Sequence, residues 1–316
     1  MLLGLLRRVG VFVTSLLVSS VLVFGLMVLL PGDPARVALG TGATDEAVAA
    51  LRHDFGLDRA LPVQYLDWLR GLVTGDLGAS YVSRAPIAPQ VADRLQVSLL
   101  LVLAALLVAV VVALPLGTLA ALHHRRPLGV VLAAVSQLGV AVPAFLVGVL
   151  LISYFAVRLG WFPANGWTPP AEDPVMFLRQ LTLPALSLGL VQAAVLSRYV
   201  RSAVLDVLHE DYLRTARAKG LRPGPALVRH GLRNASVPVM TVLGLQLATT
   251  LIGAVVVERV FVVPGLGSLL LDSVGNRDLL VVQDVVMVLV VAVLVVNLLV
   301  DLLYVVLDPR LRTGTR

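Results

Sequence analysis

The side chains of this sequence that could do chemistry lie mainly in two short basic segments. The longer is H-E-D-Y-L-R-T-A-R-A-K-G-L-R-P at 209–223, which holds the only lysine of the chain, Lys219. A phosphate-binding P-loop requires G-x-x-x-x-G-K-[ST], but Lys219 is followed by glycine, and His209–Glu210 does not continue as H-E-x-x-H. The shorter segment, H-H-R-R at 123–126, has no carboxylate cluster beside it to complete a metal site. The sequence therefore predicts no catalytic residue, no metal site, no bound cofactor and no ATP hydrolysis by this chain itself.

The segment at 209–223 has the features of a short helix. Asp211 is a capping residue, Gly220 can adopt the left-handed conformation that ends a helix, and Pro223 prevents its continuation. The helix would have about two and a half turns, which is far too short to cross a membrane.

The two faces of this short helix differ in chemistry. One face is formed by small and apolar residues: Leu213, Ala216, Gly220 and Leu221. Arg214 and Arg217 form a basic face. Small residues at 215, 216 and 218 would let another protein approach the backbone closely. Because a basic helix can also lie along anionic lipid, the residues leave docking of a partner protein and binding to the membrane surface both open.

A second polar group follows one face of a long apolar stretch. Gln246, Thr249, Thr250 and Gly253 are spaced i, i+3, i+4 and i+7 along a helix. They can line a substrate pathway, or they can serve helix packing, for which small and hydroxyl residues are also used. Since an amide is costly to bury without a partner, Gln246 favours the pathway.

The elements that position these residues have the composition of a membrane protein. Of 316 residues, 58% are apolar and 14% are charged, and the mean hydropathy is +0.94, whereas a soluble domain is about 25% charged. A helix needs about 20 apolar residues to cross the hydrocarbon core, so six stretches are predicted to span the membrane: 9–30, 97–122, 128–157, 181–203, 237–257 and 280–307. The first is too long for the apolar region of a signal peptide. The fold class is therefore an all-α integral membrane protein.

The basic residues predict the orientation of these spans. Six spans place both termini on one side of the membrane. That side receives most of the connecting basic residues: Arg7, Arg8, the H-H-R-R turn, six residues between 204 and 236, Arg310, Arg312 and Arg316. The opposite short loops hold Arg158, Arg179, Arg259 and Arg277. By the positive-inside rule both termini are expected in the cytoplasm, and the formal charge of +6 reflects cytoplasmic loops, not nucleic-acid binding.

The long segment at 31–96 is predicted to be a folded excursion outside the membrane, with short helices. A-T-D-E-A-V-A-A-L-R-H-D-F-G begins with a capping residue and ends in Gly56, as a short helix would. The next helix, P-V-Q-Y-L-D-W-L-R-G-L-V, is amphipathic, with an apolar face formed by Tyr65, Trp68, Leu69 and Leu72. This face can lie on the membrane surface or pack against the protein's own spans.

At 211–221 the sequence resembles the permease subunits of bacterial ABC importers for dipeptides, oligopeptides and nickel. D-Y-L-R-T-A-R-A-K-G-L, followed by R-H-G-L-R-N-A-S-V-P, is similar to the EAA loop of that family and above all to its peptide branch. Further motifs match in order along nearly the whole chain: L-P-G-D-P-A at 30–35, F-G-L-D-R at 55–59, G-D-L-G-A-S at 75–80, V-P-A-F at 142–145, L-P-A-L at 183–186, P-G-L-G at 264–267 and L-V-D-L-L-Y-V-V-L-D-P-R at 299–310. Two positions depart from the pattern: Thr215 stands where the general motif has Glu, and Gly231 replaces the usual Ala and would loosen the following helix.

The resemblance implies the type I ABC importer permease fold, in the bacterial cytoplasmic membrane, with four parts. These are an N-terminal transmembrane helix at 1–30, the extracytoplasmic excursion at 31–96, a five-helix core at 97–310 that contains the cytoplasmic coupling loop at 204–236, and a cytoplasmic tail at 311–316. P-G-L-G implies a short re-entrant helix at the outer gate, with Pro264, Gly265 and Gly267.

The resemblance also implies how the chain is driven. The EAA helix would couple to a partner ATPase through Asp211, Tyr212, Arg214, Thr215, Ala216, Arg217, Ala218, Lys219, Gly220 and Leu221. Support for this loop would come from His230, Arg233, Asn234 and Pro238. The implied partners are a paralogous permease, two ABC ATPase subunits that bind ATP and Mg²⁺, an extracytoplasmic substrate-binding protein and the lipid membrane.

Peptides are the cargo that the resemblance favours, with nickel complexes, glutathione or haem as alternatives on the same architecture. An ion-coupled secondary transporter is the main alternative outside the family, but it would need an intramembrane charge relay or inverted repeats, and we find neither in the sequence. A membrane-embedded enzyme would need a catalytic constellation, which the sequence also lacks.

Overall fold

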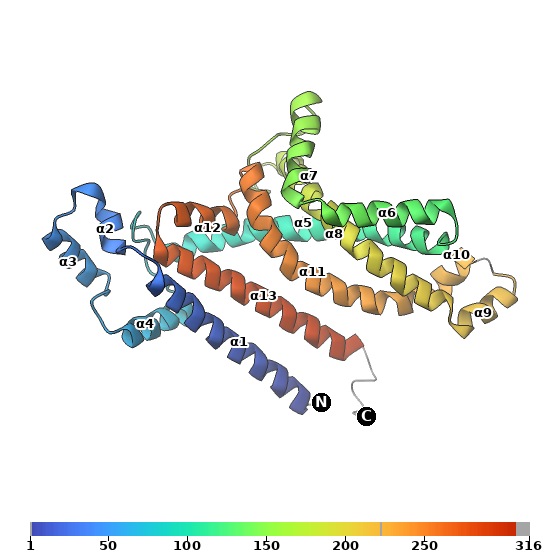
Figure 1. Cartoon of the computed structure of the whole chain (residues 1–316), viewed down its shortest axis with the longest axis horizontal. Helices are drawn as coiled ribbons and strands as arrows, with labels where there is room; N and C mark the ends of the chain where they lie inside the picture. Colours follow the sequence, from blue (N-terminus) through green and yellow to red (C-terminus); the bar gives the residue numbers. More distant parts are fainter. Residues whose placement is uncertain (1, 222, 308–316) are drawn as a thin grey trace. The chain divides into compact units, whose positions relative to one another are not determined.

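A computed structural model describes residues 2–221 and 223–307 of the chain (Figure 1). The described residues form helices and no β-strand, as the composition predicts. The elements in chain order are α1 (Leu2–Leu29), α2 (Pro34–Leu39), the 3-10 turn η1 (Gly40–Gly42), α3 (Asp45–Asp54), α4 (Leu61–Thr74), α5 (Ile87–Leu122), α6 (Pro127–Ala141), α7 (Ala144–Leu151), the π-helix η2 (Ile152–Arg158), α8 (Pro174–Leu208), α9 (Asp211–Ala218), α10 (Pro223–Ala226), the π-helix η3 (Leu227–Gly231), α11 (Leu232–Phe261), α12 (Leu266–Gly275) and α13 (Leu279–Leu307). The predicted tail at 311–316 lies outside the described residues.

The chain folds into two compact units. Unit 1 comprises Met1–Ser98 and Pro264–Leu298, and unit 2 comprises Leu99–Val263 and Leu299–Arg316. Unit 1 thus joins α1 to the segment at 31–96 and the start of α13, and unit 2 holds the helices around the loop at 204–236. The four parts predicted from the sequence are defined by the side of the membrane on which each lies, so the division into two units does not test them. They stay a prediction.

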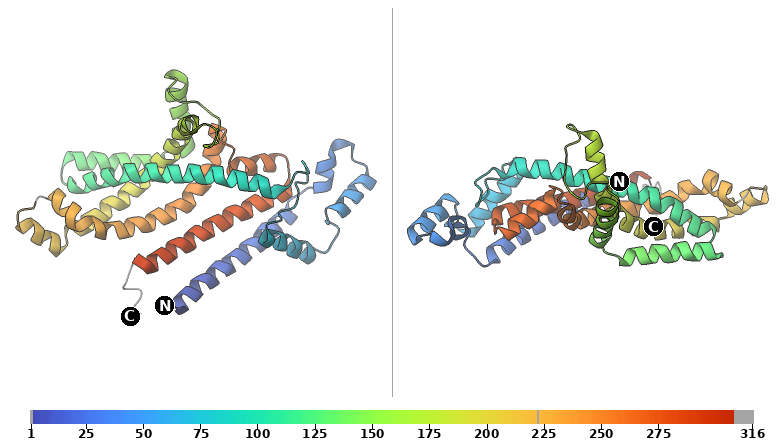
Figure 2. Two further views of the ribbon diagram at one scale, coloured as in Figure 1. Left: turned by 180° about the vertical axis from the view of Figure 1, so that it is seen from behind. Right: turned by 90° about the horizontal axis from the view of Figure 1, so that it is seen from above.

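Five of the six predicted spans are long continuous apolar helices. These are Leu6–Leu29, Ile87–Leu122, Pro174–Leu208, Asn234–Phe261 and Leu279–Val300. The stretch predicted as a continuous third span, 128–157, is instead broken into α6 and the α7–η2 helix, which meet at an angle of 99° (Figures 1 and 2). The break falls at Pro143, which lacks the amide hydrogen that a continuous helix would need.

Helix α3 of the excursion forms as its end residues predict. The Thr44 hydroxyl caps it by accepting a hydrogen bond from the Ala47 amide at 3.3 Å, and Gly56 follows its end with φ of +67°. Helices α2 and α3 bury Ala35, Val48 and Leu51 in a small core of their own.

Helix α4 packs against the protein's own spans within unit 1. The Tyr65 hydroxyl lies 2.9 Å from the Ser20 hydroxyl of α1, and the Trp68 indole donates to the Asp284 carboxylate of α13 at 2.8 Å. Tyr65, Trp68, Leu69 and Leu72 are half-buried, as the predicted apolar face requires. Of the two interpretations open from the sequence, the structure therefore favours packing for this face of α4.

Helices α5 and α8 approach each other closely in unit 2 at two glycines. A Cβ at Gly117 would lie 2.6 Å from the Ser197 carbonyl oxygen, and a Cβ at Gly189 would lie 2.6 Å from the Ala105 carbonyl oxygen. Membrane helices use small residues in this way, because tight packing replaces the hydrophobic driving force that water provides. A polar group within this span is also satisfied, since the Ser197 hydroxyl of α8 donates to the Ser136 hydroxyl of α6 at 2.9 Å.

Candidate functional site

Helix α9 carries the basic segment that the sequence singles out. It begins at Asp211 itself, and the Glu210 carbonyl accepts hydrogen bonds from the amides of Leu213 and Arg214 at 3.1 and 3.2 Å. The predicted capping residue is therefore inside the first turn. There its carboxylate accepts from the Arg214 guanidinium at 3.5 Å.

Glycine closes the other end of α9, as predicted. Gly220 has φ of +94°, and the Leu221 amide donates to the Ala216 carbonyl at 3.3 Å, which is the six-to-one hydrogen bond of a Schellman motif. Leu221 and Ala216 lie in the same hydrophobic cluster, which supplies the apolar contact that accompanies this cap. Because a residue with a Cβ is strained at this φ, Gly220 fixes where α9 stops.

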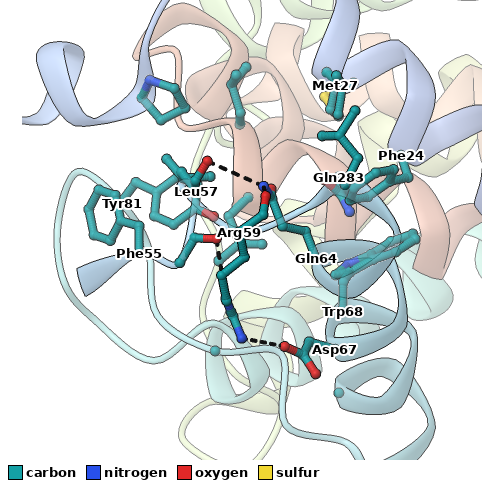
Figure 3. Close-up of a pocket in the computed structure, with 18 of the residues that line it drawn as sticks. Phe24, Met27, Phe55, Leu57, Arg59, Gln64, Asp67, Trp68, Tyr81 and Gln283 are labelled. Carbon is teal, nitrogen blue, oxygen red and sulfur yellow. Dashed lines mark hydrogen bonds and ion pairs between the residues drawn. The ribbon is translucent and has the colours of Figure 1, made fainter. Parts of the chain in front are cut away.

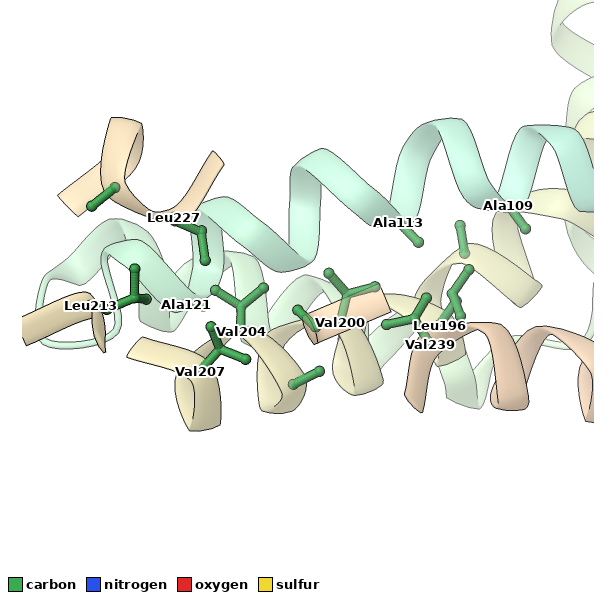
Figure 4. Close-up of a cluster of buried hydrophobic side chains, with 14 of the residues drawn as sticks. Ala109, Ala113, Ala121, Leu196, Val200, Val204, Val207, Leu213, Leu227 and Val239 are labelled. Carbon is green, nitrogen blue, oxygen red and sulfur yellow. The ribbon is translucent and has the colours of Figure 1, made fainter. Parts of the chain in front are cut away.

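The apolar face of α9 rests on a hydrophobic platform that we define as Ala121, Val204, Val207 and Leu227. Leu213 is fully buried against it, and Ala216 is 8% exposed (Figure 4). The sequence predicts Ala216 as a small residue that a partner protein could approach. The structure corrects this, because Ala216 faces the chain's own core while Thr215 and Ala218 are exposed.

The outward face of α9 is polar and basic. Tyr212 is 37% exposed. Arg214 and Lys219 are exposed as well. The Thr215 hydroxyl donates to the Asp211 carbonyl at 3.0 Å, so this threonine satisfies its donor within the helix. The side chain of Arg217 lies outside the part that the structure describes. What α9 offers to a partner is therefore a short cationic face with an aromatic side chain at its start.

One predicted support residue contacts α9 directly. The Asn234 amide, near the start of α11, donates to the Tyr212 hydroxyl at 2.9 Å and so joins α9 to that span. Pro238 is exposed within α11, and the side chains of His230 and Arg233 lie outside the described part of the chain.

Gly231 lies at a point of close packing beneath α9. It is buried, and a Cβ there would lie 2.8 Å from Leu227 Cδ1 and 2.9 Å from Val207 Cγ1. The glycine thus permits close packing beneath α9, and α11 continues from Leu232 to Phe261. Gly231 is the last residue of the π-helix η3, and the expected loosening of the following helix stays a prediction.

The predicted polar stripe of α11 is divided between two environments. Gln246 and Thr250 are buried between α11 and α8, where Gln192 Nε2 donates to the Thr250 hydroxyl at 2.8 Å and Gln246 Nε2 donates to the Gln192 carbonyl at 3.0 Å. Gly253 lies against Leu188, and Thr249 is exposed. Within this chain the buried pair serves helix packing, and pathway lining by the stripe stays a prediction.

The P-G-L-G segment leads into a short helix, as expected for this position. Helix α12 has ten residues, and the Leu266 amide at its start donates to the Ser98 hydroxyl at 2.8 Å. Gly265 is its N-terminal flanking residue, next to Pro264, and Gly267 is buried in its first turn. Its apolar face packs with α5 and α13 residues such as Ile87 and Val285. A gating role for Pro264, Gly265 and Gly267 stays a prediction.

Sequence reasoning missed a buried acidic group near the start of α13. Asp284 is fully buried, its Oδ1 accepts from Trp68, and its Oδ2 has no hydrogen bond within the described residues. Asp278 is 6% exposed and accepts from the Ser80 hydroxyl and the Tyr81 amide. The available signal was an aspartate inside the predicted span 280–307, since such residues are rare and functional there by default.

Beside these acids, unit 1 contains a cavity of about 510 Å³, which we call the outer pocket (Figure 3). It lies among the end of α1, the α3–α4 connection, α4 and the start of α13. Burial, with the nearby carboxyl groups of Asp284 and Asp278, raises the pKa of Tyr81 to about 12. Tyr81 therefore remains a neutral phenol at physiological pH.

Comparisons with known proteins agree with this architecture. The model of the family described as "Binding-protein-dependent transport system inner membrane component" matches residues 113–313, and that of its N-terminal component matches residues 1–104. A Brucella abortus protein that carries the name of a peptide transport system permease is 40% identical over 308 residues, which cover 98% of each chain. The glutathione transport system permease protein of Salmonella typhimurium is 41% identical over 97% of this chain and 98% of its own.

A solved structure shows the same fold at low sequence identity. It is the crystal structure of an amino acid ABC transporter with histidines, with a TM-score of 0.53 and 16% identity, covering 68% of this chain and 93% of that one. These matches, with the apolar helices described above, explain why the chain lacks catalytic motifs. The chain belongs to the family of inner-membrane components of binding-protein-dependent transport systems, and it is a multi-pass permease subunit of an ABC transport system, not an enzyme.

Proposed function

We propose that this permease forms half of a translocation pathway that imports peptides, with ATP hydrolysed by separate partner subunits that bind ATP and Mg²⁺. The observation that carries the peptide assignment is identity of 40% or more, over nearly the whole chain, with relatives named for transport of peptides and of glutathione, itself a small peptide. Nickel complexes and haem are less favoured, because neither appears in the names of these relatives.

The proposed handle for the ATPase is the outward face of α9. Its apolar face is held by the hydrophobic platform, so a force on the helix passes to α8 and, through Tyr212 and Asn234, to α11. Docking of a partner protein is favoured over lipid binding for a physical reason. The outward face offers polar and basic groups but no apolar stripe, since Leu213 and Ala216 are buried inward. An interfacial helix needs such a stripe to bury in the bilayer.

The proposed orientation places α9 and both termini in the cytoplasm of a bacterium and the excursion outside the inner membrane. Ala121, just before the H-H-R-R turn, belongs to the same cluster as Leu213, so two basic segments lie at one end of unit 2. Their shared side follows the positive-inside rule. The proposed partners are a paralogous permease, two ATPases and an extracytoplasmic binding protein.

Reconstitution tests the cargo. We expect proteoliposomes that contain the whole transporter, with its binding protein outside and ATP inside, to accumulate a labelled di- or pentapeptide, and unlabelled glutathione to compete less well. Uptake should stop when ATP is replaced by a non-hydrolysable analogue. Uptake of a nickel chelate but no peptide would overturn the peptide assignment, and uptake that persists without ATP would overturn the importer mechanism.

Charge reversal on α9 tests the proposed docking face. Because Arg214 and Lys219 are exposed, Arg214→Glu with Lys219→Glu is expected to weaken association with the ATPase subunits about five- to tenfold and to alter its salt dependence. The measurement is co-purification of the ATPases at low and high salt. The matched control is Arg125→Glu with Arg126→Glu, which changes the charge equally at the same end of unit 2. Equal losses in both variants would contradict docking through α9.

A further inference from the structure

The outer pocket has a side-chain amide on its wall, that of Gln283. Gln283 lines the pocket, is 7% exposed, and has no side-chain hydrogen bond among the described residues. Its neighbour Gln64 is committed, because its Nε2 donates to the Arg59 carbonyl at 2.7 Å and to the Leu57 carbonyl at 3.3 Å. An amide that faces a pocket can donate and accept hydrogen bonds at once, so Gln283 suits a ligand that carries both an acceptor and a donor.

The wall beside Gln283 is aromatic and fixed. Phe24 and Trp68 lie with ring centroids 6.0 Å apart, and Figure 3 shows them on the same side of the pocket as Gln283. The hydrogen bond from Trp68 to Asp284 sets the orientation of the indole, which leaves its apolar surface for contact. This wall suits an apolar side chain.

The polar part of the pocket carries both signs of charge. Arg52 pairs with Asp33 at 2.9 Å, and Arg59 pairs with Asp67 at 2.6 Å. These side chains are partly exposed, so the pairs are weak and can exchange partners at little cost. The pocket is lined by two arginines and three aspartates, the third being Asp76, so it does not select a polyanion. Charges of both signs suit a ligand with one ammonium and one carboxylate group.

We propose that the outer pocket binds a short zwitterionic peptide directly. A peptide bond is the group that pairs with the Gln283 amide as donor and acceptor at once, an apolar side chain covers Phe24 and Trp68, and the termini reach Arg59 and Asp33. A volume of about 510 Å³ lies within the range of about 300–1,000 Å³ of small-ligand sites. The site deepens the proposed function and rests on it for the ligand class, since cargo would meet the permease here after leaving the binding protein.

Tryptophan fluorescence tests the site without transport. The chain has three tryptophans, so the background Trp161→Phe with Trp167→Phe leaves Trp68 as its single indole. The assembled transporter in nanodiscs, without binding protein or ATP, is titrated with Ala-Leu-Ala. A complex that lacks only the Trp68 indole of this chain gives the baseline, which is the fluorescence of the partner subunits. We expect a saturable change in fluorescence. The same tripeptide with blocked termini should bind more weakly, because it cannot use the rim pairs.

Gln283→Leu and Gln283→Met are both expected to weaken binding about tenfold, the loss that follows from removing hydrogen bonds to a buried group. Gln90→Leu is the matched control, an identical change in unit 1 away from the pocket, and should bind normally. Melting of each complex, followed in parallel, separates lost binding from lost folding.

Two results would overturn the proposal. One is no saturable change in fluorescence at a peptide concentration about a thousand times a micromolar Kd, and the other is equal affinity in all variants. If peptide uptake persists although the pocket binds no peptide, only the proposed site is wrong. If the pocket binds peptide but the transporter takes up none, only the proposed function is wrong.

Discussion

Leu213→Ala is expected to remove most ATP-driven uptake while the chain still inserts in the membrane. Leu213 is fully buried between α9 and the hydrophobic platform. Truncating a buried leucine typically costs about 2–5 kcal/mol. Helix α9 has eight residues, and helices shorter than about 12–15 residues are marginal on their own, so this loss should detach α9 from its platform. The measurement is peptide uptake per assembled transporter, with ATPase co-purification as a second readout.

Leu138→Ala is the matched control for this prediction. Leu138 in α6 is 68% exposed, so the same truncation removes little buried surface. Its uptake should stay near that of the unaltered protein. Normal uptake in Leu213→Ala would mean that α9 transmits force without the Leu213 side chain. That result would contradict the role that we assign to the hydrophobic platform.

Gly189→Ala is expected to destabilise the contact between α5 and α8. The new Cβ would lie 2.6 Å from the Ala105 carbonyl oxygen and 2.7 Å from Val108 Cβ, and backbone cannot yield as a flexible side chain can. Overpacking of this kind costs about 1–3 kcal/mol, and we expect the melting temperature of the detergent-solubilised chain to fall by about 5 °C. Thermal melting followed by size-exclusion chromatography measures this change.

Gly25→Ala is the matched control, a glycine-to-alanine change in a helix that causes no steric clash. A Cβ at Gly25 in α1 would have nothing within 4 Å in the described chain. Since alanine is the better helix former, this variant should melt no lower than the unaltered protein. Equal melting of the Gly189 and Gly25 variants would show that α5 and α8 separate freely.

Much of the fold can be predicted from local chemistry. Apolar length identifies five spans, because each is long enough by itself to cross the bilayer. End residues such as Thr44 and Gly220 identify short helices, since capping depends on only a few neighbouring backbone groups. The periodicity of α4 identifies the buried face that contains Tyr65 and Trp68, but only tertiary structure shows that this face meets α1 and α13.

The remaining features depend on contacts between distant segments. The residues on both sides of Pro143 are apolar, so hydropathy cannot distinguish a straight span from a sharply bent one. The small size of Ala216 fits both a partner's surface and the chain's own core, and its burial decides between them. The outer pocket could not be predicted, because Phe24 and Gln283 are far apart in sequence and meet only through folding.

The bend between α6 and α7 has a consequence for the biogenesis of the protein. Helix α6 has 15 residues and is about 22 Å long, which is shorter than the hydrocarbon core of about 30 Å. By its length alone it is not expected to cross the bilayer as an ordinary span. Its lasting partner is α8, and α7 packs on α8 and α11, all of which are synthesised later. We therefore expect the bent α6–α7 pair to reach its final packing only after α8 and α11 have been synthesised.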